Sequence, residues 1–180
     1  AEFAQDKTLP ETVKRDPPLN SKLYKNAMRY RKLETNIRIY DSADELSTDD
    51  QTLLKAAARA MDLAYAPYSN FKVGAAVRLT DGTIVIGSNQ ENAAYPMCLC
   101  AERVALGNAS LNHPTEKLQT LAIRVRNENK AIPEPAAPCG SCRQAISEME
   151  ERQQQPIRIL MQGDDDMIYE VESGQVLLPL

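Results

Sequence analysis

The four cysteines constrain this chain more than any other feature, because all of them lie in two short motifs. Residues 98–103 read Cys-Leu-Cys-Ala-Glu-Arg, and residues 138–143 read Pro-Cys-Gly-Ser-Cys-Arg. Thiolates bind Zn²⁺ well, and three protein ligands leave a fourth position for water. A carboxylate two residues from a ligand can move protons to and from that water. The pattern therefore predicts a catalytic zinc site, and the fold must bring the two motifs together.

The predicted zinc ligands are Cys100, Cys139 and Cys142, and the predicted catalytic residue is Glu102. A structural alternative stays open at this point, in which Cys98 completes a closed four-cysteine site that holds the fold together without catalysis. A closed site would give no purpose to the carboxylate beside the first motif, which favours the open, three-cysteine arrangement.

Two arginines follow the ligands closely, Arg103 in the first motif and Arg143 in the second. Electron donation from three thiolate sulfurs lowers the Lewis acidity of Zn²⁺ toward bound water. Hydrogen bonds from guanidinium groups to those sulfurs would restore it, so we predict that both arginines contact the ligands. The alternative for each is an ordinary surface salt bridge.

Hydrophobic periodicity predicts the surrounding elements. Helices are expected from the N-cap at Ser47 to Pro67, from Cys100 to about Leu111, and from Cys139 to about Arg152. Both metal motifs thus fall at helix starts, where the dipole and free N–H groups favour thiolate over thiol. Tyr65 is expected on the buried face of the first helix.

The predicted strands span residues 71–79, 83–87, 120–125, 157–161 and 167–171. Residues 36–40 alternate between polar and apolar side chains, which is also typical of a short strand. An Asp-Gly pair at 81–82 joins the first two as a hairpin. Helices between the later strands imply crossovers. We therefore expect an α/β fold: a three-layer α/β/α domain with a mixed five-stranded sheet and helices on both faces.

Charge divides the chain into two predicted regions. Residues 7–38 carry nine Lys/Arg and three Asp/Glu, a net +6, whereas the whole chain has −4, so the remainder sums to −10. We expect a basic N-terminal extension over 1–45, either solvated or packed on a partner subunit, and a catalytic domain over 46–180. The net charge gives no bulk attraction to nucleic acid or acidic membranes, and no apolar run is long enough to span a bilayer. Four cysteines are too few for a disulfide scaffold, and their spacing suits metal binding in a reducing compartment. Together with the lack of a signal-peptide pattern, this favours the cytoplasm.

Four segments together resemble the small homotetrameric cytidine deaminases: 65–76, 87–95, 100–103 and 138–144. The resemblance runs over about 47–179 with the motifs in order, and it does not cover the first 45 or so residues. It implies one zinc ion per subunit and hydrolysis of cytidine and 2′-deoxycytidine to uridine and 2′-deoxyuridine with release of ammonia. It also implies a homotetramer that acts on small nucleosides, with neither a nucleic acid polymer nor a membrane as partner.

The resemblance also assigns substrate contacts. It implies that Asn89 and Glu91 hold the ribose 3′-hydroxyl, which an amide and a carboxylate can do by donating and accepting. It places Phe71 against the pyrimidine and gives Glu102 the role of proton shuttle. The remaining implied contacts are backbone groups of Ala101 at the base, and a stretch with Ala93 and Tyr95 that reaches a neighbouring subunit's site.

Two alternative substrates follow from the same fold. One is another cytosine compound such as blasticidin S, which the intact ribose pair disfavours. The other is a polynucleotide, which is disfavoured because the first ligand is Cys rather than His and the domain is acidic. Where many family members carry an aromatic residue after the final Leu-Leu-Pro, this sequence has Leu180.

Overall fold

Six strands form one mixed sheet in the computed structural model, which describes residues 31–178. The strands are β1 (Arg38–Tyr40), β2 (Phe71–Leu79), β3 (Ile84–Ser88), β4 (Leu118–Asn127), β5 (Arg158–Gln162) and β6 (Ile168–Val171). Their order across the sheet is β1-β6-β5-β4-β2-β3. Only β4 and β5 pair in parallel; the other neighbours are antiparallel. The predicted mixed sheet is thereby confirmed.

The predicted count of five strands is wrong by one edge strand. β1 pairs antiparallel with β6, with Ile39 opposite Tyr169. The alternation over residues 36–40 indicated this strand without including it in the predicted sheet, and its pairing with β6 adds it at the edge. The first 30 residues of the predicted basic extension lie outside the described residues. The division at 45/46 stays a prediction, although β1 places residues 38–40 in the sheet.

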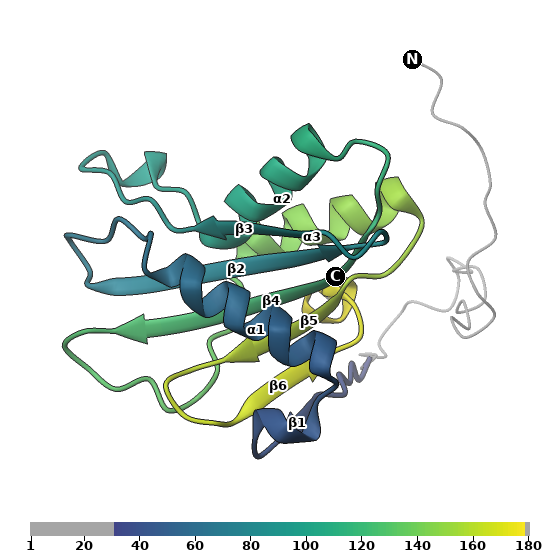
Figure 1. Ribbon diagram of the computed structural model, residues 1–180, viewed down its shortest axis with the longest axis horizontal. Helices are drawn as coiled ribbons and strands as arrows, with labels where there is room; N and C mark the ends of the chain where they lie inside the picture. The colour runs from purple at the N-terminus through teal and green to yellow at the C-terminus, as the bar shows by residue number, and fades with distance from the viewer. Residues whose placement is uncertain (1–30, 179–180) are drawn as a thin grey trace, which may run out of the picture. The chain divides into compact units, whose positions relative to one another are not determined.

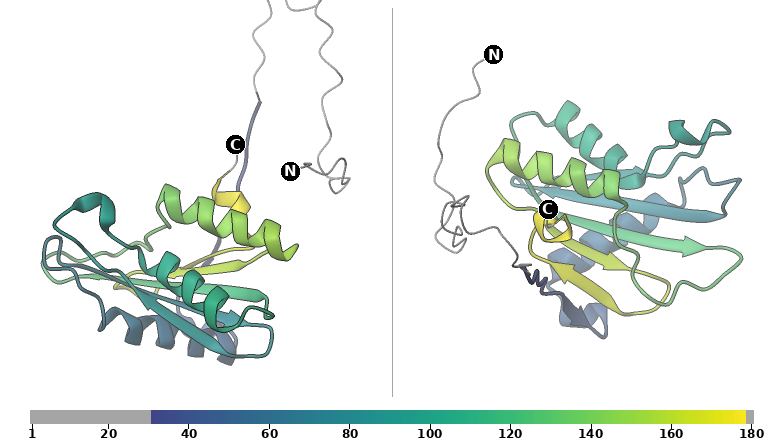
Figure 2. Two further views of the ribbon diagram at one scale, coloured as in Figure 1. Left: turned by 90° about the horizontal axis from the view of Figure 1, so that it is seen from above. Right: turned by 180° about the vertical axis from the view of Figure 1, so that it is seen from behind.

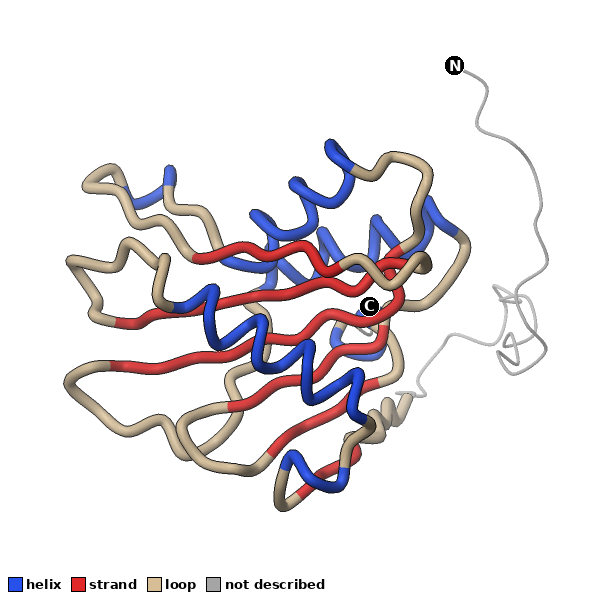
Figure 3. Tube along the Cα trace, viewed as in Figure 1, coloured by secondary structure: helices blue, strands red, loops and turns tan. Residues whose placement is uncertain are grey.

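Three helices cover the two faces of the sheet: α1 (Thr48–Met61), α2 (Ala101–Asn112) and α3 (Gly140–Gln153). Figures 1 and 2 show α1 alone on one face and α2 beside α3 on the other, which confirms the three-layer expectation. Figure 3 shows α1 lying across several strands. Among the described residues, none of the helices is long and apolar enough to cross a membrane.

Helix α1 ends six residues before Pro67, earlier than predicted. The chain leaves the helix because the loop after β3 takes its backbone groups: Tyr65 N–H donates to Asn89 O at 3.0 Å, and Glu91 N–H donates to Tyr65 O at 2.8 Å. The side chain of Tyr65 is 54% exposed, so its expected place in the core is wrong.

A buried ion network fixes the start of α1 to the sheet. Asp50 accepts hydrogen bonds from Arg158 and from Arg78, the latter at 2.9 Å, and from the hydroxyl of the N-cap Ser47 at 2.8 Å. Burial alone would raise the pKa of Asp50, but these donors outweigh it, and the pKa is lowered from 3.8. The carboxylate is therefore ionised in the folded protein.

Two apolar clusters lie on either side of the sheet. Adjacent residues of β2 supply both, since Ala76 faces α1 and Val77 faces the side of α2 and α3. On the latter face, α2 lies very close to β3. A Cβ added at Gly87 would lie 2.4 Å from Ala105 N and 2.5 Å from Ala101 O. Glycine at this position lets the start of α2 lie directly on the strand.

Candidate metal centre and active site

The strand directions bring the two cysteine motifs to one edge of the sheet. β3 and β4 both run antiparallel to β2, so they run parallel to each other and end at the same edge. The chain after β3 leads to Cys100, which is the N-cap of α2, and the chain after β4 leads to Cys139, which is the N-cap of α3. The first residue of β2, Phe71, lies at the same edge, opposite Asn127.

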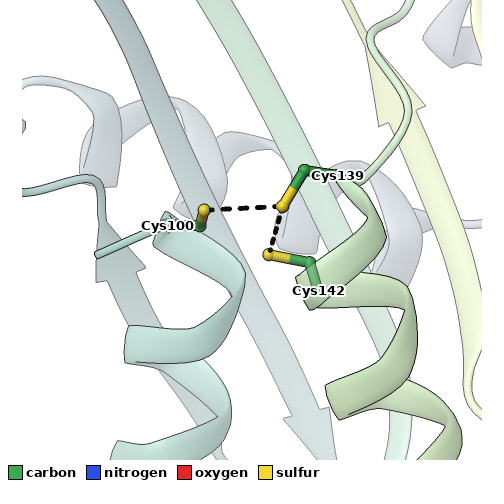
Figure 4. A group of neighbouring side chains, drawn as sticks. All are labelled: Cys100, Cys139 and Cys142. Carbon is green, nitrogen blue, oxygen red and sulfur yellow. Dashed lines mark hydrogen bonds between the residues drawn. The ribbon is translucent and has the colours of Figure 1, made fainter. Parts of the chain in front are cut away.

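Three sulfurs converge between the two helix starts. The Sγ atoms of Cys100 and Cys139 are 3.7 Å apart, and those of Cys139 and Cys142 are 3.5 Å apart. All three lie within 4.8 Å of one another (Figure 4). Zn²⁺ held tetrahedrally at 2.3 Å from each sulfur would separate them by about 3.8 Å. The donor set therefore fits zinc in kind and in spacing, as predicted.

Cys98 does not belong to this group of sulfurs. Its Sγ instead accepts a hydrogen bond from Asn92 N at 3.3 Å and faces Asn92 O at 3.7 Å. The described cluster has three cysteines rather than four. This is the arrangement of a catalytic zinc site, which keeps a fourth position for water.

The first ligand is poised to ionise. The neighbouring Cys142 thiol and the Arg103 guanidinium stabilise a charge on the Cys100 sulfur and lower the pKa of Cys100 to about 5, against the effect of burial. Once Cys100 is ionised, a second thiolate beside it is disfavoured, and the pKa of Cys142 is raised. A divalent cation among the sulfurs would remove this repulsion.

The two arginines behave differently from each other. Arg103 Nη2 donates to Cys100 Sγ at 3.7 Å and to Cys98 O at 3.1 Å, which is the predicted contact with a ligand. Arg143 instead donates to Pro138 O at 2.8 Å and to Leu177 O at 3.0 Å. Its predicted sulfur contact is not among the described hydrogen bonds. Arg143 therefore joins the C-terminal segment to the residue before Cys139, because its guanidinium reaches the backbone carbonyls of both Pro138 and Leu177.

Glu102 lies in the first turn of α2 and is 5% exposed. Burial, together with the nearby charge of Cys100, raises the pKa of its carboxyl group. The side chain lines the same cavity as Cys100 and Cys139. A carboxyl group with a raised pKa holds a proton more readily than an exposed one, which suits a group that accepts and returns a proton beside a metal centre.

The cavity in front of the sulfurs has a volume of about 390 Å³. Six of the seven predicted substrate-binding and catalytic residues line it, and only Ala93 does not: Phe71, Asn89, Glu91, Tyr95, Ala101 and Glu102. Apolar walls come from residues that the sequence reasoning missed: Val73, Leu99, Ile123, Val125, Ala136 and Ala137. The alternation along β4 could have indicated Ile123 and Val125, because both face the metal helices. Nothing in the loop around 136–137 gave such a signal.

Asn89 and Glu91 also hold the protein's own backbone. Asn89 accepts from Val73 N at 2.8 Å and donates to Phe71 O at 2.9 Å. Glu91 accepts from the N–H groups of Tyr68 and Ser69 at 3.0 and 3.3 Å. Burial would raise the pKa of Glu91, but these donors and the Ser69 hydroxyl outweigh it, so the pKa is lowered. Both residues therefore fix the start of β2, where Phe71 enters the cavity.

Comparison with known proteins gives a consistent picture. Residues 47–155 match the family described as the cytidine and deoxycytidylate deaminase zinc-binding region. A cytidine deaminase from Halalkalibacterium halodurans is 43% identical over 101 residues, which is 56% of this chain and 72% of the relative. One from Sporosarcina psychrophila is 42% identical over 100 residues, covering 56% and 69%. The crystal structure of a cytidine deaminase from Burkholderia pseudomallei superposes with a TM-score of 0.60 at 35% identity, covering 69% of this chain and 93% of that one.

Proposed function

Because this chain belongs to the cytidine and deoxycytidylate deaminase family, we propose that it hydrolyses free cytidine and 2′-deoxycytidine to uridine and 2′-deoxyuridine, with release of ammonia. The observation that carries the proposal is the convergence of three thiolate ligands and the buried carboxyl group of Glu102 on one cavity. This reaction is a step of pyrimidine salvage.

The lining of the cavity favours a nucleoside over its 5′-phosphate. Among the described residues that line it, none is Lys, Arg or His, and Glu91 contributes a negative charge. A phosphate in such a site would lose its hydration without gaining a cation or a charged hydrogen-bond donor, which costs more than the roughly 2–7 kcal/mol for burying a neutral polar group without a partner. Deoxycytidylate, the other substrate class in the family description, therefore fits this site poorly.

Each group of residues has a distinct task in the proposed reaction. Phe71 and the apolar walls hold the flat pyrimidine and exclude bulk water. The backbone of Ala101 contacts the base, and the remaining donor and acceptor capacity of Asn89 and Glu91 holds the ribose 3′-hydroxyl. When bound, zinc supplies Lewis acidity that makes water a nucleophile at neutral pH.

Glu102 carries the protons of the reaction. Its carboxylate takes a proton from the attacking water, whose oxygen bonds to C4 of the base. It delivers that proton to ring N3, then takes the proton of the new C4 hydroxyl group and passes it to the amine, so that ammonia leaves and the C4 carbonyl forms as the C4–N4 bond breaks. Arg103 acts on the ligand set, because its hydrogen bond to the Cys100 sulfur draws electron density away from the thiolate.

The test follows the loss of substrate absorbance for four compounds: cytidine, 2′-deoxycytidine, deoxycytidylate and blasticidin S. We expect turnover of the first two and weak turnover of the others. Glu102→Gln should lower kcat by about 10²- to 10⁴-fold with zinc content retained. The matched control is Glu148→Gln, an exposed glutamate on α3, which should keep full activity. A zinc-loaded wild type that is inactive on both nucleosides would refute the proposal.

We propose further that the protein assembles as a homotetramer in the cytoplasm. Tyr95 supports this proposal, since it lines the cavity while the residue is 85% exposed in the single chain. A neighbouring subunit that covers this ring would also help to close the site. Light scattering after size exclusion measures the assembly, and a monomeric active enzyme would contradict it.

A further inference from the structure

The loop between β3 and α2 brings Tyr95 and Leu99 to the cavity, so its conformation matters for binding. Its base is closed by a pair of backbone hydrogen bonds between Gln90 and Leu99, each 2.9 Å long. Above this pair, the chain makes one 3₁₀ turn, η2 (Tyr95–Met97). The segment is largely exposed, so its own contacts must hold it in place.

One side chain joins the two ends of the exposed part of this loop. The sulfur of Cys98 lies 3.3 Å from Asn92 N and 3.7 Å from Asn92 O, so that it faces both backbone groups of one residue. A thiol can accept from the N–H and donate to the carbonyl, each weakly. We name this pair of contacts the Asn92–Cys98 clasp.

The clasp is connected to the metal centre through a second side chain. Arg103 Nη2 donates to Cys98 O at 3.1 Å and to Cys100 Sγ at 3.7 Å. The backbone of Cys98 is thus held against α2, while its thiol holds Asn92. The Cys98 end of the loop is therefore bonded to α2, the helix that carries Glu102, and the Asn92 end is bonded to Cys98 through the clasp.

We propose that Cys98 is a positioning residue for substrate binding: its thiol closes the 92–98 loop and so holds the cavity wall that Tyr95 forms. This inference rests on the proposed function, since substrate binding is its main consequence. It also gives the fourth cysteine a role other than metal binding. The thiol contacts of the clasp involve neither Glu102 nor the three ligands, so their loss is expected to affect KM rather than kcat.

Three substitutions separate the hydrogen bonds of the clasp from the size of the side chain. Cys98→Ser keeps a donor and an acceptor, Cys98→Val keeps the bulk without them, and Cys98→Ala removes both and serves if the valine variant folds poorly. With weak hydrogen bonds at stake, we expect Cys98→Val and Cys98→Ala to raise KM for cytidine by about threefold to tenfold. Their kcat and zinc content should match wild type, and Cys98→Ser should lie within about twofold of wild type in KM.

Hydrogen–deuterium exchange gives a readout that does not depend on activity. The peptide over residues 91–98 should exchange faster in Cys98→Val than in Cys98→Ser or wild type, because Asn92 N–H loses its acceptor. Met97→Ala is the matched control: this exposed neighbour in the same loop should change neither exchange nor KM.

Three other outcomes would overturn the clasp. A Cys98→Ser variant as impaired as Cys98→Val would remove the role of the hydrogen bonds, and so would a Cys98→Val variant that matches wild type in both KM and exchange. Loss of zinc in Cys98→Ser would make Cys98 a ligand instead. A wild type that deaminates neither nucleoside refutes the proposed function alone, since the exchange comparison still decides whether the clasp exists.

Discussion

Glu150 offers the clearest test of how α3 is held in place. This carboxylate is 3% exposed and accepts four hydrogen bonds from the C-terminal part of the chain. Oε1 accepts from Ile157 N at 2.6 Å and Gly174 N at 2.8 Å. Oε2 accepts from Ser173 Oγ at 3.0 Å and Gln175 N at 3.2 Å. One side chain therefore joins α3 to the start of β5 and to the 3₁₀ helix η3 (Gly174–Leu177).

Replacing Glu150 with glutamine keeps the shape and leaves a single oxygen. The amide oxygen can keep the two buried N–H donors, but the new NH₂ group then faces Gln175 N–H, where two donors oppose each other. The reverse orientation is worse, because the buried N–H groups of Ile157 and Gly174 lose their acceptor. The loss of one hydrogen bond to a charged group, and the weakening of others, should cost about 2–3 kcal/mol.

Urea unfolding at a fixed protein concentration measures this cost, since assembly would make stability depend on concentration. For a domain of this size, a loss of about 2–3 kcal/mol corresponds to a Tm lower by about 4–12 °C. Glu148→Gln, on the exposed side of α3, should change stability by less than about 0.5 kcal/mol. If Glu150→Gln matched that control, the four hydrogen bonds would contribute nothing measurable, and the reasoning would be refuted.

Three further predictions follow from the same structure. The arginines bonded to Asp50 lower its pKa. The stabilisation from its carboxylate is therefore present above the unfolded pKa of 3.8 and is lost as pH falls through the folded pKa. In urea titrations, the difference in stability between wild type and Asp50→Asn should shrink below about pH 4. Gly87→Ala should lower stability and zinc content, because its Cβ meets the backbone of α2, whereas Gly107→Ala, with open space around it, should be neutral or stabilising by thermal melting. Arg103→Met should lower kcat with zinc mostly retained, whereas Arg143→Met should lower the Tm and leave kcat nearly unchanged.

The metal ligands could be predicted from the sequence because their signals are local. Cysteine spacing and helix-start patterns depend on residues close in the chain, and the helices α2 and α3 begin immediately after Cys100 and Cys139, as expected. The hairpin at Asp81-Gly82 could also be predicted from a local signal, because Gly82 has a φ of +86°, which glycine adopts without strain. The strand bounds lay within one or two residues of prediction for the same reason.

The errors concern residues whose place depends on distant partners. Tyr65 fits the apolar period of α1, yet the loop after β3 captures its backbone and turns it outward. Arg143 sits beside a ligand in sequence, but the carbonyl of Leu177 lies within its reach and takes its hydrogen bond. Neither partner is visible in a local pattern, because each becomes a neighbour only after the sheet has formed.

Predicting that the fourth zinc position is open requires both the local sequence pattern and the arrangement of the strands. The spacing of the cysteines favours Cys100 as the ligand but leaves Cys98 as a possible fourth one, since a Cys-x-Cys pair can chelate from a loop. The shared direction of β3 and β4 then brings both helix starts to one edge, with Cys100 as the N-cap of α2 and Cys98 still in the loop. Only a residue at the helix start meets the two sulfurs of α3, and Cys98 turns back to Asn92. Moving the first ligand by two residues would therefore lose the site, so the strand topology, and not the motif alone, selects three ligands over four.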